Sequence, residues 1–372
     1  MESKTVPPAP ASNGGNGGAA FLEFEKPISQ LYRNIEELQA DQARTNRDHS
    51  KEIADQRELL MAMYKKIYCH LSPWETVQVA RHPKRPLFPD YIRLMVKDFC
   101  ELHGDRNFRD DRAIVTGFGR IDRQKVMIIG HSKGRDTKER LENHFGMAHP
   151  EGYRKALAKM KLAAKFRLPV VCLIDTAGAY PGVGAEERGI AQAIAVNLLE
   201  MARLPTPIVC VVVGEGGSGG ALGIGVGDRI AMLEHAWYSV ISPEGCAAIL
   251  WKSSEYAAKA SETLRLTSRD LKKLSLIDDV IREPMGGAHR DPEAAVAAVG
   301  HYVSETLRDL KRVKIDTLLK RRYRKLRDMA SFHEDATSPA ATGATTRTRR
   351  RTRTPATTPA ASDAGRAPAA LV

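Results

Sequence analysis

Two apolar segments, each followed by a glycine-rich loop and then a helix-forming segment, constrain the fold of this chain most. They span residues 170–174 and 207–213, and every position in the first is apolar. A strand that is apolar throughout, rather than at alternate positions, is typical of a parallel sheet covered by helices on both faces. The pattern therefore predicts an α/β fold built around a buried parallel sheet.

The flanking segments extend this pattern. Further strands are predicted at residues 113–118, 126–129, 229–233 and 238–241, and helices at 91–102, 153–168, 188–203 and 291–327. Apolar side chains at helical spacing, such as Ile28, Leu31 and Ile35, predict two amphipathic helices within residues 27–71. This pair either covers an edge of the core or forms an arm that binds a partner.

The charge of the chain is concentrated near its C-terminal end. The net charge is +12 over 372 residues, and residues 311–328 carry nine Lys or Arg against two Asp. Residues 338–372 add six Arg and one Asp in a sequence rich in Thr, Ala and Pro. The near-neutral remainder argues against nucleic-acid binding as the function of the whole protein. The basic segments 311–327 and 347–353 leave such binding open as a secondary property.

Several classes of protein are disfavoured by simple counts. No apolar run reaches 18 residues and residues 1–20 lack a signal-like apolar stretch, so a cytoplasmic location is expected and no membrane contact. The five cysteines include no C-x-x-C pair, so we expect no metal site in this chain. Residues 1–20 and 331–372 have compositions typical of disorder.

The two glycine loops span residues 175–189 and 214–222. A loop between a strand and a helix directs free backbone N–H groups toward one point, where they can hold a phosphate or an oxyanion. Neither loop has the Gly-Lys-Ser/Thr of a Walker A motif, and the first does not fit G-x-G-x-x-G. Each loop alone could be a tight turn only, but two in consecutive β-loop-α units favour a shared site.

The second loop also fits the G-x-S-x-G pattern of a serine hydrolase, with Ser218 as the nucleophile. Such an enzyme needs a histidine, and His235 and His289 are the available candidates. A self-contained hydrolase or isomerase of this kind would act without a partner.

Other polar residues near these segments have two interpretations each. His131 either orients a ligand or is a core or loop histidine, and the second is favoured. A basic cluster either contacts the phosphates of coenzyme A or forms a solvated basic face. It consists of Lys133, Arg135, Lys138 and Arg140.

Residues 21–327 closely resemble the α subunits of acetyl-CoA carboxylase carboxyltransferases. Besides the two glycine loops, the matching stretches are ARHP at 80–83, YIRL at 91–94, MIIGH at 127–131, KGR at 133–135, NHFGM at 143–147, PEGYRKA at 150–156, SVISPEGCA at 239–247 and PMGGAH at 284–289. Two features depart from the family: Ala177 stands where proline is common, and the Arg-rich tail has no counterpart.

This resemblance implies a crotonase-like α/β fold, a spiral of repeated β-β-α units with an N-terminal helical region. We expect a helical region at 21–105 and a carboxyltransferase domain at 106–330, between a disordered N-terminus at 1–20 and a disordered tail at 331–372.

The resemblance also implies a function. An α subunit of this family acts only with its β subunit, in an α2β2 heterotetramer. Together they transfer the carboxyl group of carboxybiotin to acetyl-CoA, which gives malonyl-CoA for fatty acid biosynthesis. The biotin is attached to a biotin carboxyl carrier protein and loaded by biotin carboxylase, and a zinc ion is expected on β. A relative that acts on propionyl-CoA remains an alternative.

The resemblance finally implies roles for the glycine loops. The backbone N–H groups of Gly219 and Gly220 are expected to stabilise the negative charge on biotin during catalysis. Gly178, Ala179, Gly216 and Gly217 are expected to line the carboxybiotin pocket. This mechanism needs no nucleophilic side chain.

Overall fold

The computed structural model describes residues 21–329, so the termini expected to be disordered lie outside the described residues. No helix within this range combines the length and apolarity needed to cross a membrane.

One sheet of eight strands organises the molecule. The strands are β1 (Val96–Glu101), β2 (Ile114–Ile121), β3 (Gln124–His131), β4 (Val170–Thr176), β5 (Ile208–Gly217), β6 (Arg229–Leu233), β7 (Trp237–Ser239) and β8 (Asp279–Ile281). Their order is β1-β2-β3-β4-β5-β6-β8, and β7 pairs with the end of β5. The strands from β3 onward pair in parallel, whereas β1, β2 and β3 pair antiparallel.

Fourteen α-helices are found in the described range. They are α1 (Lys26–Thr45), α2 (Ser50–Tyr68), α3 (Pro73–Ala80), α4 (Phe88–Met95), α5 (Thr137–Glu142), α6 (Pro150–Lys165), α7 (Val183–Glu187), α8 (Ile190–Arg203), α9 (Ser218–Leu222), α10 (Pro243–Trp251), α11 (Ala257–Leu264), α12 (Ser268–Lys273), α13 (Pro292–Leu310) and α14 (Ile315–Arg327). Short 3-10 helices lie at Glu23–Glu25, His144–Gly146 and Ser254–Tyr256.

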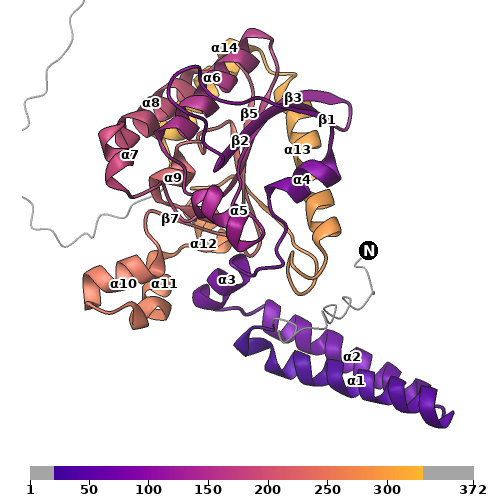
Figure 1. Cartoon of the computed structure of the whole chain (residues 1–372). Coiled ribbons are helices and arrows are strands. Elements are labelled where there is room, and N and C mark those ends of the chain that lie inside the picture. Colours follow the sequence, from indigo (N-terminus) through magenta and orange to yellow (C-terminus); the bar gives the residue numbers. More distant parts are fainter. Residues whose placement is uncertain (1–20, 330–372) are drawn as a thin grey trace, which may run out of the picture. The chain divides into compact units, whose positions relative to one another are not determined.

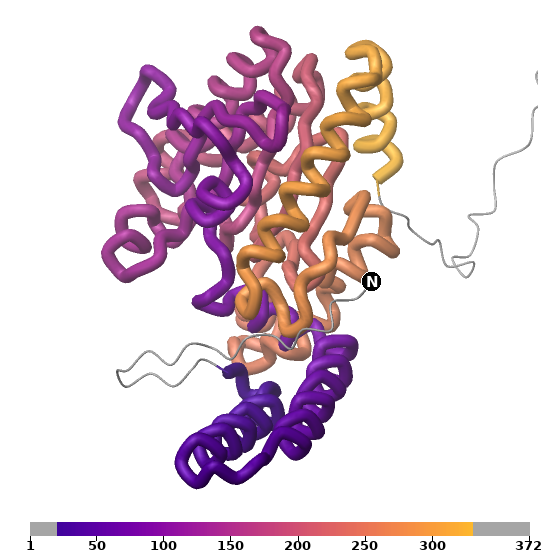
Figure 2. Tube along the Cα trace, turned by 90° about the vertical axis from the view of Figure 1, so that its right-hand side faces the viewer, coloured from indigo at the N-terminus to yellow at the C-terminus, as the bar shows by residue number. Residues whose placement is uncertain are grey.

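Helices cover the sheet on both faces. On one face α6 packs against β2 and β3 and also contacts α8, which in turn contacts α14 (Figure 1). On the other face α13 contacts β2, β5 and β8 and packs beside α4, and Figure 2 shows this helix in orange next to α14. This arrangement confirms the predicted α/β class.

The central strands are buried because both faces are covered. All seven residues of β4 and all ten of β5 are buried, in agreement with the continuous apolar segments of the sequence. Helix α6 begins at Pro150, a residue suited to the first helical turn, and buries the predicted apolar face of Tyr153, Leu157 and Met160. The core therefore lies between the sheet and these helices.

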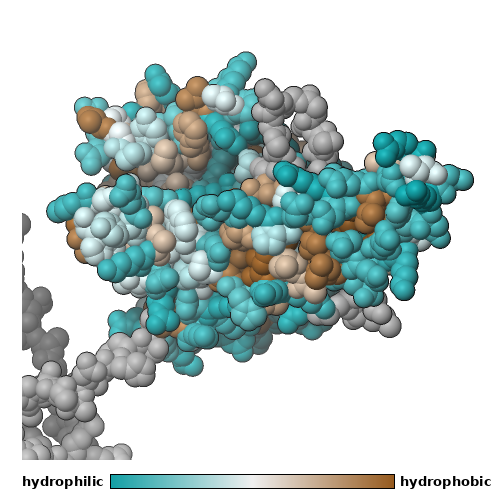
Figure 3. All heavy atoms as spheres, turned by 90° about the horizontal axis from the view of Figure 1, so that it is seen from below, coloured by the Kyte–Doolittle hydropathy of each residue, from teal (hydrophilic) through white to brown (hydrophobic). Residues whose placement is uncertain are grey.

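The N-terminal helices α1 and α2 form a hairpin with a core of its own. Its buried residues are Ile28, Leu31, Tyr32, Ile35, Ile53, Leu60, Tyr64 and Tyr68, with Val79. The base of the hairpin is held by Arg290, whose guanidinium lies 2.8 Å from the buried Glu25 carboxylate. Seen from below, hydrophobic residues lie among hydrophilic ones on the right-hand part of the face, the side on which Figure 1 has α1 and α2 (Figure 3). The hairpin mainly packs on itself, so it does not simply cover an edge of the core.

Three predictions about the elements were wrong in part. The sheet is mixed, because only Asp122 and Arg123 separate β2 from β3 and so short a turn joins antiparallel strands. The helix predicted at 91–102 ends at Met95, where β1 begins. The helix predicted at 291–327 is two helices, since Lys314 is extended (φ −61°, ψ 141°) and interrupts it.

Candidate active site at the two glycine loops

The two glycine loops meet at one edge of the sheet. They leave β4 and β5, which are neighbouring parallel strands. A methyl group on Gly217 would lie 2.0 Å from the carbonyl oxygen of Ala177, and one on Gly220 would lie 2.3 Å from the carbonyl carbon of Gly178. Unstrained contacts between carbon atoms are about 3.5–4.0 Å long. The loops are therefore packed backbone against backbone, which requires glycine at positions 217 and 220.

Two other glycines in these loops have room beside them. A methyl group on Gly178 would meet nothing within 4 Å, and one on Gly219 would meet only Ile194, at 3.5 Å. Five residues of the loops thus surround a region with tight packing on one side and open space on the other. They are Gly178, Ala179, Gly217, Gly219 and Gly220. Such a place lets a ligand approach the backbone closely.

Gly216 is placed differently from the other predicted pocket residues. It lies within β5, opposite Thr176 of β4 and Tyr238 of β7. A methyl group on Gly216 would lie 2.9 Å from the Tyr238 ring. Its small size therefore serves the packing of β7 on β5.

The second loop turns directly into helix α9. Gly219 and Gly220 lie in the first turn of α9, where backbone N–H groups have no carbonyl partner inside the helix. Ser218, which precedes them, has φ 53°, a left-handed conformation that costs about 1–2 kcal/mol for a residue other than glycine. The turn presents backbone N–H donors at the edge where the first loop arrives, which suits an anionic ligand.

The two histidines that a serine hydrolase would need are engaged elsewhere. The His235 ring lies 5.5 Å from the Tyr68 ring, and the His289 ring stacks on His82 at 3.9 Å. Within the described residues the Ser218 hydroxyl has no hydrogen-bond partner. The strained backbone of Ser218 therefore comes without the base that a nucleophilic serine requires.

A network of charges supports the strand ends below the loops. The Lys133 ammonium lies 2.6 Å from the Asp175 carboxylate and 2.6 Å from that of Glu215. The Arg81 guanidinium contacts Glu215 at 2.6 Å and also pairs with Glu244. In addition, Asp175 accepts the backbone N–H of Glu215 at 2.9 Å. These bonds join the last residues of β4 and β5 and so fix the two loops relative to each other.

The charges in this network are stabilised by one another. Burial would raise the pKa of the Glu215 carboxyl, but the positive charges of Lys133 and Arg81 outweigh burial and lower that pKa to about 2. Burial would lower the pKa of Lys133, but Asp175 and Glu215 outweigh it and raise that pKa. Lys133 is thus a structural cation, and Arg135 pairs with Asp90 at 2.8 Å. These two members of the predicted basic cluster already have carboxylate partners.

His131, at the end of β3, is buried, and its ring lies beside the backbone of Gly220 in the second loop. Burial lowers its pKa to about 3, so the ring is neutral near neutral pH. This agrees with the favoured interpretation of a core histidine.

Three aromatic rings that were not predicted as site residues lie together beside the first loop. The Tyr180 ring lies 4.1 Å from the His149 ring and 5.3 Å from the His144 ring. The chain between these histidines is unusual, because His144, Phe145 and Gly146 all have positive φ. His144 lies in the string NHFGM and His149 directly precedes the string PEGYRKA, so the resemblance was the one signal near them.

Among residues 21–329 no group of three or more His, Cys, Asp or Glu side chains is placed to hold a metal ion.

Comparison with known proteins gives consistent matches over nearly all of the described chain. Residues 21–330 match the family described as acetyl co-enzyme A carboxylase carboxyltransferase-like. The acetyl-coenzyme A carboxylase carboxyl transferase subunit alpha of Rhodopirellula baltica is 55% identical over 319 residues, which are 85% of this chain and 98% of that protein. The subunit of the same name from Thiobacillus denitrificans is 54% identical over 314 residues, 84% of this chain and 98% of that protein.

Among solved structures, a transcarboxylase 12S with methylmalonyl-coenzyme A and methylmalonic acid bound is similar in part. It shares 20% sequence identity with this chain at a TM-score of 0.48, over 62% of this chain and 44% of that one.

Proposed function

The chain belongs to the acetyl co-enzyme A carboxylase carboxyltransferase-like family, and from this premise we propose that it works as the α subunit of an acetyl-CoA carboxylase carboxyltransferase. Its reaction moves a carboxyl group from carboxybiotin to acetyl-CoA and forms malonyl-CoA, the first committed step of fatty acid biosynthesis. The observation that carries this proposal is the family match over residues 21–330, which includes both glycine loops. The crotonase-like α/β fold expected for this family agrees with the mixed sheet and its two helical layers.

We propose that this chain supplies the biotin side of the site. Carboxybiotin supplies the carboxyl group to be transferred, and negative charge must be stabilised on an oxygen of the biotin ring system as that group leaves. The N–H groups of Gly219 and Gly220 are free for this task because they begin α9. A preorganised backbone donor of this kind typically contributes about 3 kcal/mol to transition-state stabilisation.

The residues around these donors fit a flat ligand with a polar edge. The open space at Gly178 and beside Gly219 is where such a ligand can approach, and the contact between Gly220 and Ala179 closes the other side. We propose Gly178, Ala179 and Gly217 as pocket residues on this ground, with Gly216 supporting them from within the sheet. The network of Lys133 and Glu215 holds the donors in place before the ligand arrives.

A partner subunit is proposed to cover the exposed apolar residues next to the loops. Val183 on α7, Leu199 on α8 and Leu222 on α9 are 72%, 55% and 39% exposed. These helices contact one another in sequence, α7 with α8 and α8 with α9. Apolar side chains gathered beside a functional site are typical of a protein interface. We propose that the β subunit docks here and supplies the acetyl-CoA side of the site.

The docking surface can be tested with charge substitutions. Val183→Glu with Leu199→Glu is expected to weaken association with β at least tenfold, measured by sedimentation of the mixed subunits. The matched control is Phe166→Glu, because Phe166 is 59% exposed and follows α6 instead of a glycine loop. Equal weakening by both variants would contradict the proposed position of β.

The remaining parts of the assembly follow from the family and are proposals for this chain. They are an α2β2 heterotetramer, biotin attached to a biotin carboxyl carrier protein and loaded by biotin carboxylase, and zinc on β. The division into a helical region at 21–105 and a carboxyltransferase domain at 106–330 is proposed on the same ground, although β1 of the sheet comes from the first of these regions.

The experiment that tests the function measures carboxyl transfer between malonyl-CoA and free biotin. The chain is assayed alone and mixed with a candidate β subunit. Transfer in the mixture alone is expected, because each chain holds half of the site. Acyl-CoA turnover by the lone chain, abolished in Ser218→Ala, would contradict the proposal and favour the hydrolase.

A further inference from the structure

The C-terminal helix α14 carries a dense positive charge that the proposed reaction does not use. Its sequence contains six Lys or Arg and a single acidic residue, Asp316. Like charges at helical spacing destabilise a helix. Such a helix therefore has to be held in place by other contacts.

One face of α14 provides these contacts. Arg322 is fully buried and donates to the carbonyl groups of Met201, Leu204 and Thr206 at 2.7–2.9 Å. Its guanidinium also pairs with Asp228 at 2.6 Å. Buried, charge-assisted bonds of this kind fix the position and rotation of the helix. The adjoining face, which carries Tyr323, is therefore presented in a defined orientation.

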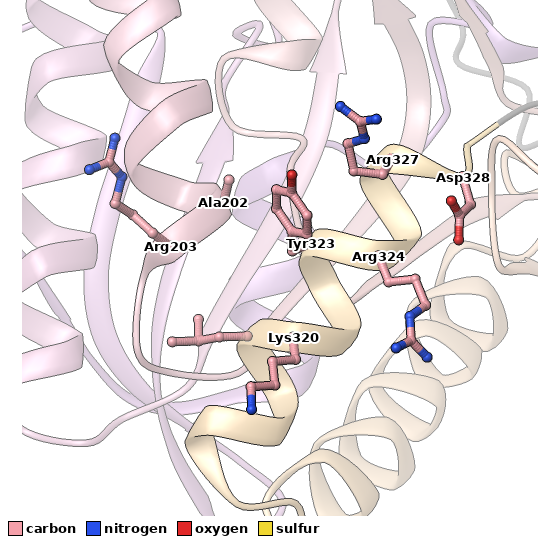
Figure 4. Close-up of a pocket in the computed structure, with 8 residues that line it drawn as sticks. Ala202, Arg203, Lys320, Tyr323, Arg324, Arg327 and Asp328 are labelled. Atoms are coloured by element: carbon pink, nitrogen blue, oxygen red, sulfur yellow. The ribbon is translucent and has the colours of Figure 1, made fainter. Parts of the chain in front are cut away.

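That adjoining face borders a pocket at the end of α8 (Figure 4). The pocket has a volume of about 810 Å³. Its lining includes Ala202 and Arg203 at the end of α8 and Lys320, Tyr323, Arg324 and Arg327 on α14. Ligand pockets generally measure about 300–1,000 Å³, so there is room for a nucleotide-sized molecule.

The pocket combines unpaired cations with an exposed aromatic ring. Within residues 21–329, no ion pair is found for Lys320, Arg324 or Arg327. By contrast, Arg322 and Lys325 of the same helix each pair with an aspartate. Tyr323 is 64% exposed, and the four cationic side chains spread around it in Figure 4. Surfaces that bind nucleotides combine these two features, because cations pair with the phosphate groups and an aromatic ring stacks on the base.

This pocket is separate from the candidate active site. The glycine loops lie near the start of α8, where Ile194 faces Gly219, whereas the pocket lies at its end, beside Ala202 and Arg203. Eight residues of α-helix from Ile194 to Ala202 span about 12 Å. A ligand in the pocket would therefore not occupy the site proposed for biotin.

We propose that this pocket binds a nucleoside phosphate, with the base stacked on Tyr323 and the phosphates held by Lys320, Arg324 and Arg327. The ligand is either a free nucleotide or part of a single-stranded nucleic acid, which present the same chemistry. The site lies within the described helices and does not depend on the arginines at 347–353.

The test measures binding to the full-length chain by fluorescence anisotropy. The probe is a labelled single-stranded RNA of roughly 12 nucleotides, within the usual range of site sizes. Tyr323→Ala is expected to weaken binding by about 5- to 150-fold, the usual effect of losing one stacked base. Tyr323→Phe keeps the ring and is expected to bind like the unmodified chain.

Charge variants separate the pocket from general basicity. The pocket triple replaces Lys320, Arg324 and Arg327 by Gln. In a plot of the logarithm of the RNA binding constant against the logarithm of the salt concentration, the magnitude of the slope is expected to fall by about 2. Each phosphate contact on a single strand contributes about 0.7 to that slope. The control replaces three exposed cations outside the pocket, Lys311→Gln, Arg312→Gln and Lys314→Gln.

Competition by ATP distinguishes the two sources of ligand. Displacement of the RNA by ATP, sensitive to Tyr323→Ala, would identify a free nucleotide, and RNA binding without such displacement would identify a strand. The proposal is overturned if Tyr323→Ala binds normally or if the control triple loses as much as the pocket triple. It is also overturned if replacing the five arginines at 347–353 by Gln abolishes binding while the pocket triple has no effect.

Discussion

Adding one methyl group at Gly220 is expected to separate the two glycine loops and disable carboxyl transfer. The methyl group of Gly220→Ala would lie 2.3 Å from the Gly178 carbonyl carbon and 2.5 Å from the Ala179 nitrogen. Both atoms belong to the backbone, so no side chain can rotate away. To restore an ordinary contact the loops must move apart by about 1 Å.

The magnitude follows from this displacement. A misplacement of about 1 Å in catalytic groups commonly lowers the rate about 100-fold. Inserting a methyl group into a packed region also destabilises a protein by about 1–3 kcal/mol. We therefore expect Gly220→Ala to remain folded but to lose about 100-fold in kcat when mixed with β.

The matched control is Gly219→Ala, which keeps the backbone N–H and adds a methyl group where only Ile194 is near, at 3.5 Å. It is expected to keep the melting temperature, whereas its methyl group enters the open space proposed for biotin and is expected to raise the KM for biotin more than it lowers kcat. The assay is carboxyl transfer between malonyl-CoA and free biotin, with thermal unfolding measured in parallel. Full activity in Gly220→Ala, or equal losses in both variants, would refute the reasoning.

Three further substitutions test the surroundings of the loops. Lys133→Met leaves the carboxylates of Asp175 and Glu215 without their shared cation. The free energy of unfolding, measured with urea, is expected to fall by about 3–5 kcal/mol. The control Lys138→Met, at an exposed position, is expected to change it by less than about 0.5 kcal/mol. The folded pKa of Glu215 is about 2, below its ordinary 4.5, so its contribution to stability is complete above pH 4.5 and is lost as the pH falls toward 2. In Glu215→Gln, the free energy of unfolding should depend less on pH in that window. The same pH dependence in the variant and the unmodified chain would count against the network. Ser218→Ala should retain transfer activity within about threefold, since no base accompanies the hydroxyl; loss of transfer would favour a nucleophilic serine.

The sequence predicted the parts of the fold that depend on local apolar patterns. β4 and β5 were found because strands buried on both faces are apolar throughout, and α6 because one helical face is apolar. The antiparallel start of the sheet was missed, since direction depends on the short turn at Asp122 and on pairing between distant segments. The break before α14 was missed because the docking of Arg322 onto Asp228 joins residues far apart in the chain.

The candidate site was predicted as far as glycine spacing allows. The proximity of the two loops followed from consecutive β-loop-α units, and the structure brings Gly178 and Gly220 into contact. The supporting network was not predictable, because Arg81, Lys133, Asp175 and Glu215 come from four separate segments. Gly216 was grouped with the pocket on the family resemblance, whereas its position is set by Tyr238 on β7.

The most direct test of the account is a structure of this chain with its β subunit and biotin bound. We predict that an oxygen of the biotin ring system lies about 3 Å from the amide nitrogens of Gly219 and Gly220, the distance of a preorganised donor. Biotin bound beside Gly178 with that oxygen facing the two amides would support backbone stabilisation of the charge. Biotin bound away from both loops, or with its oxygen directed at a side chain such as Ser218, would contradict it.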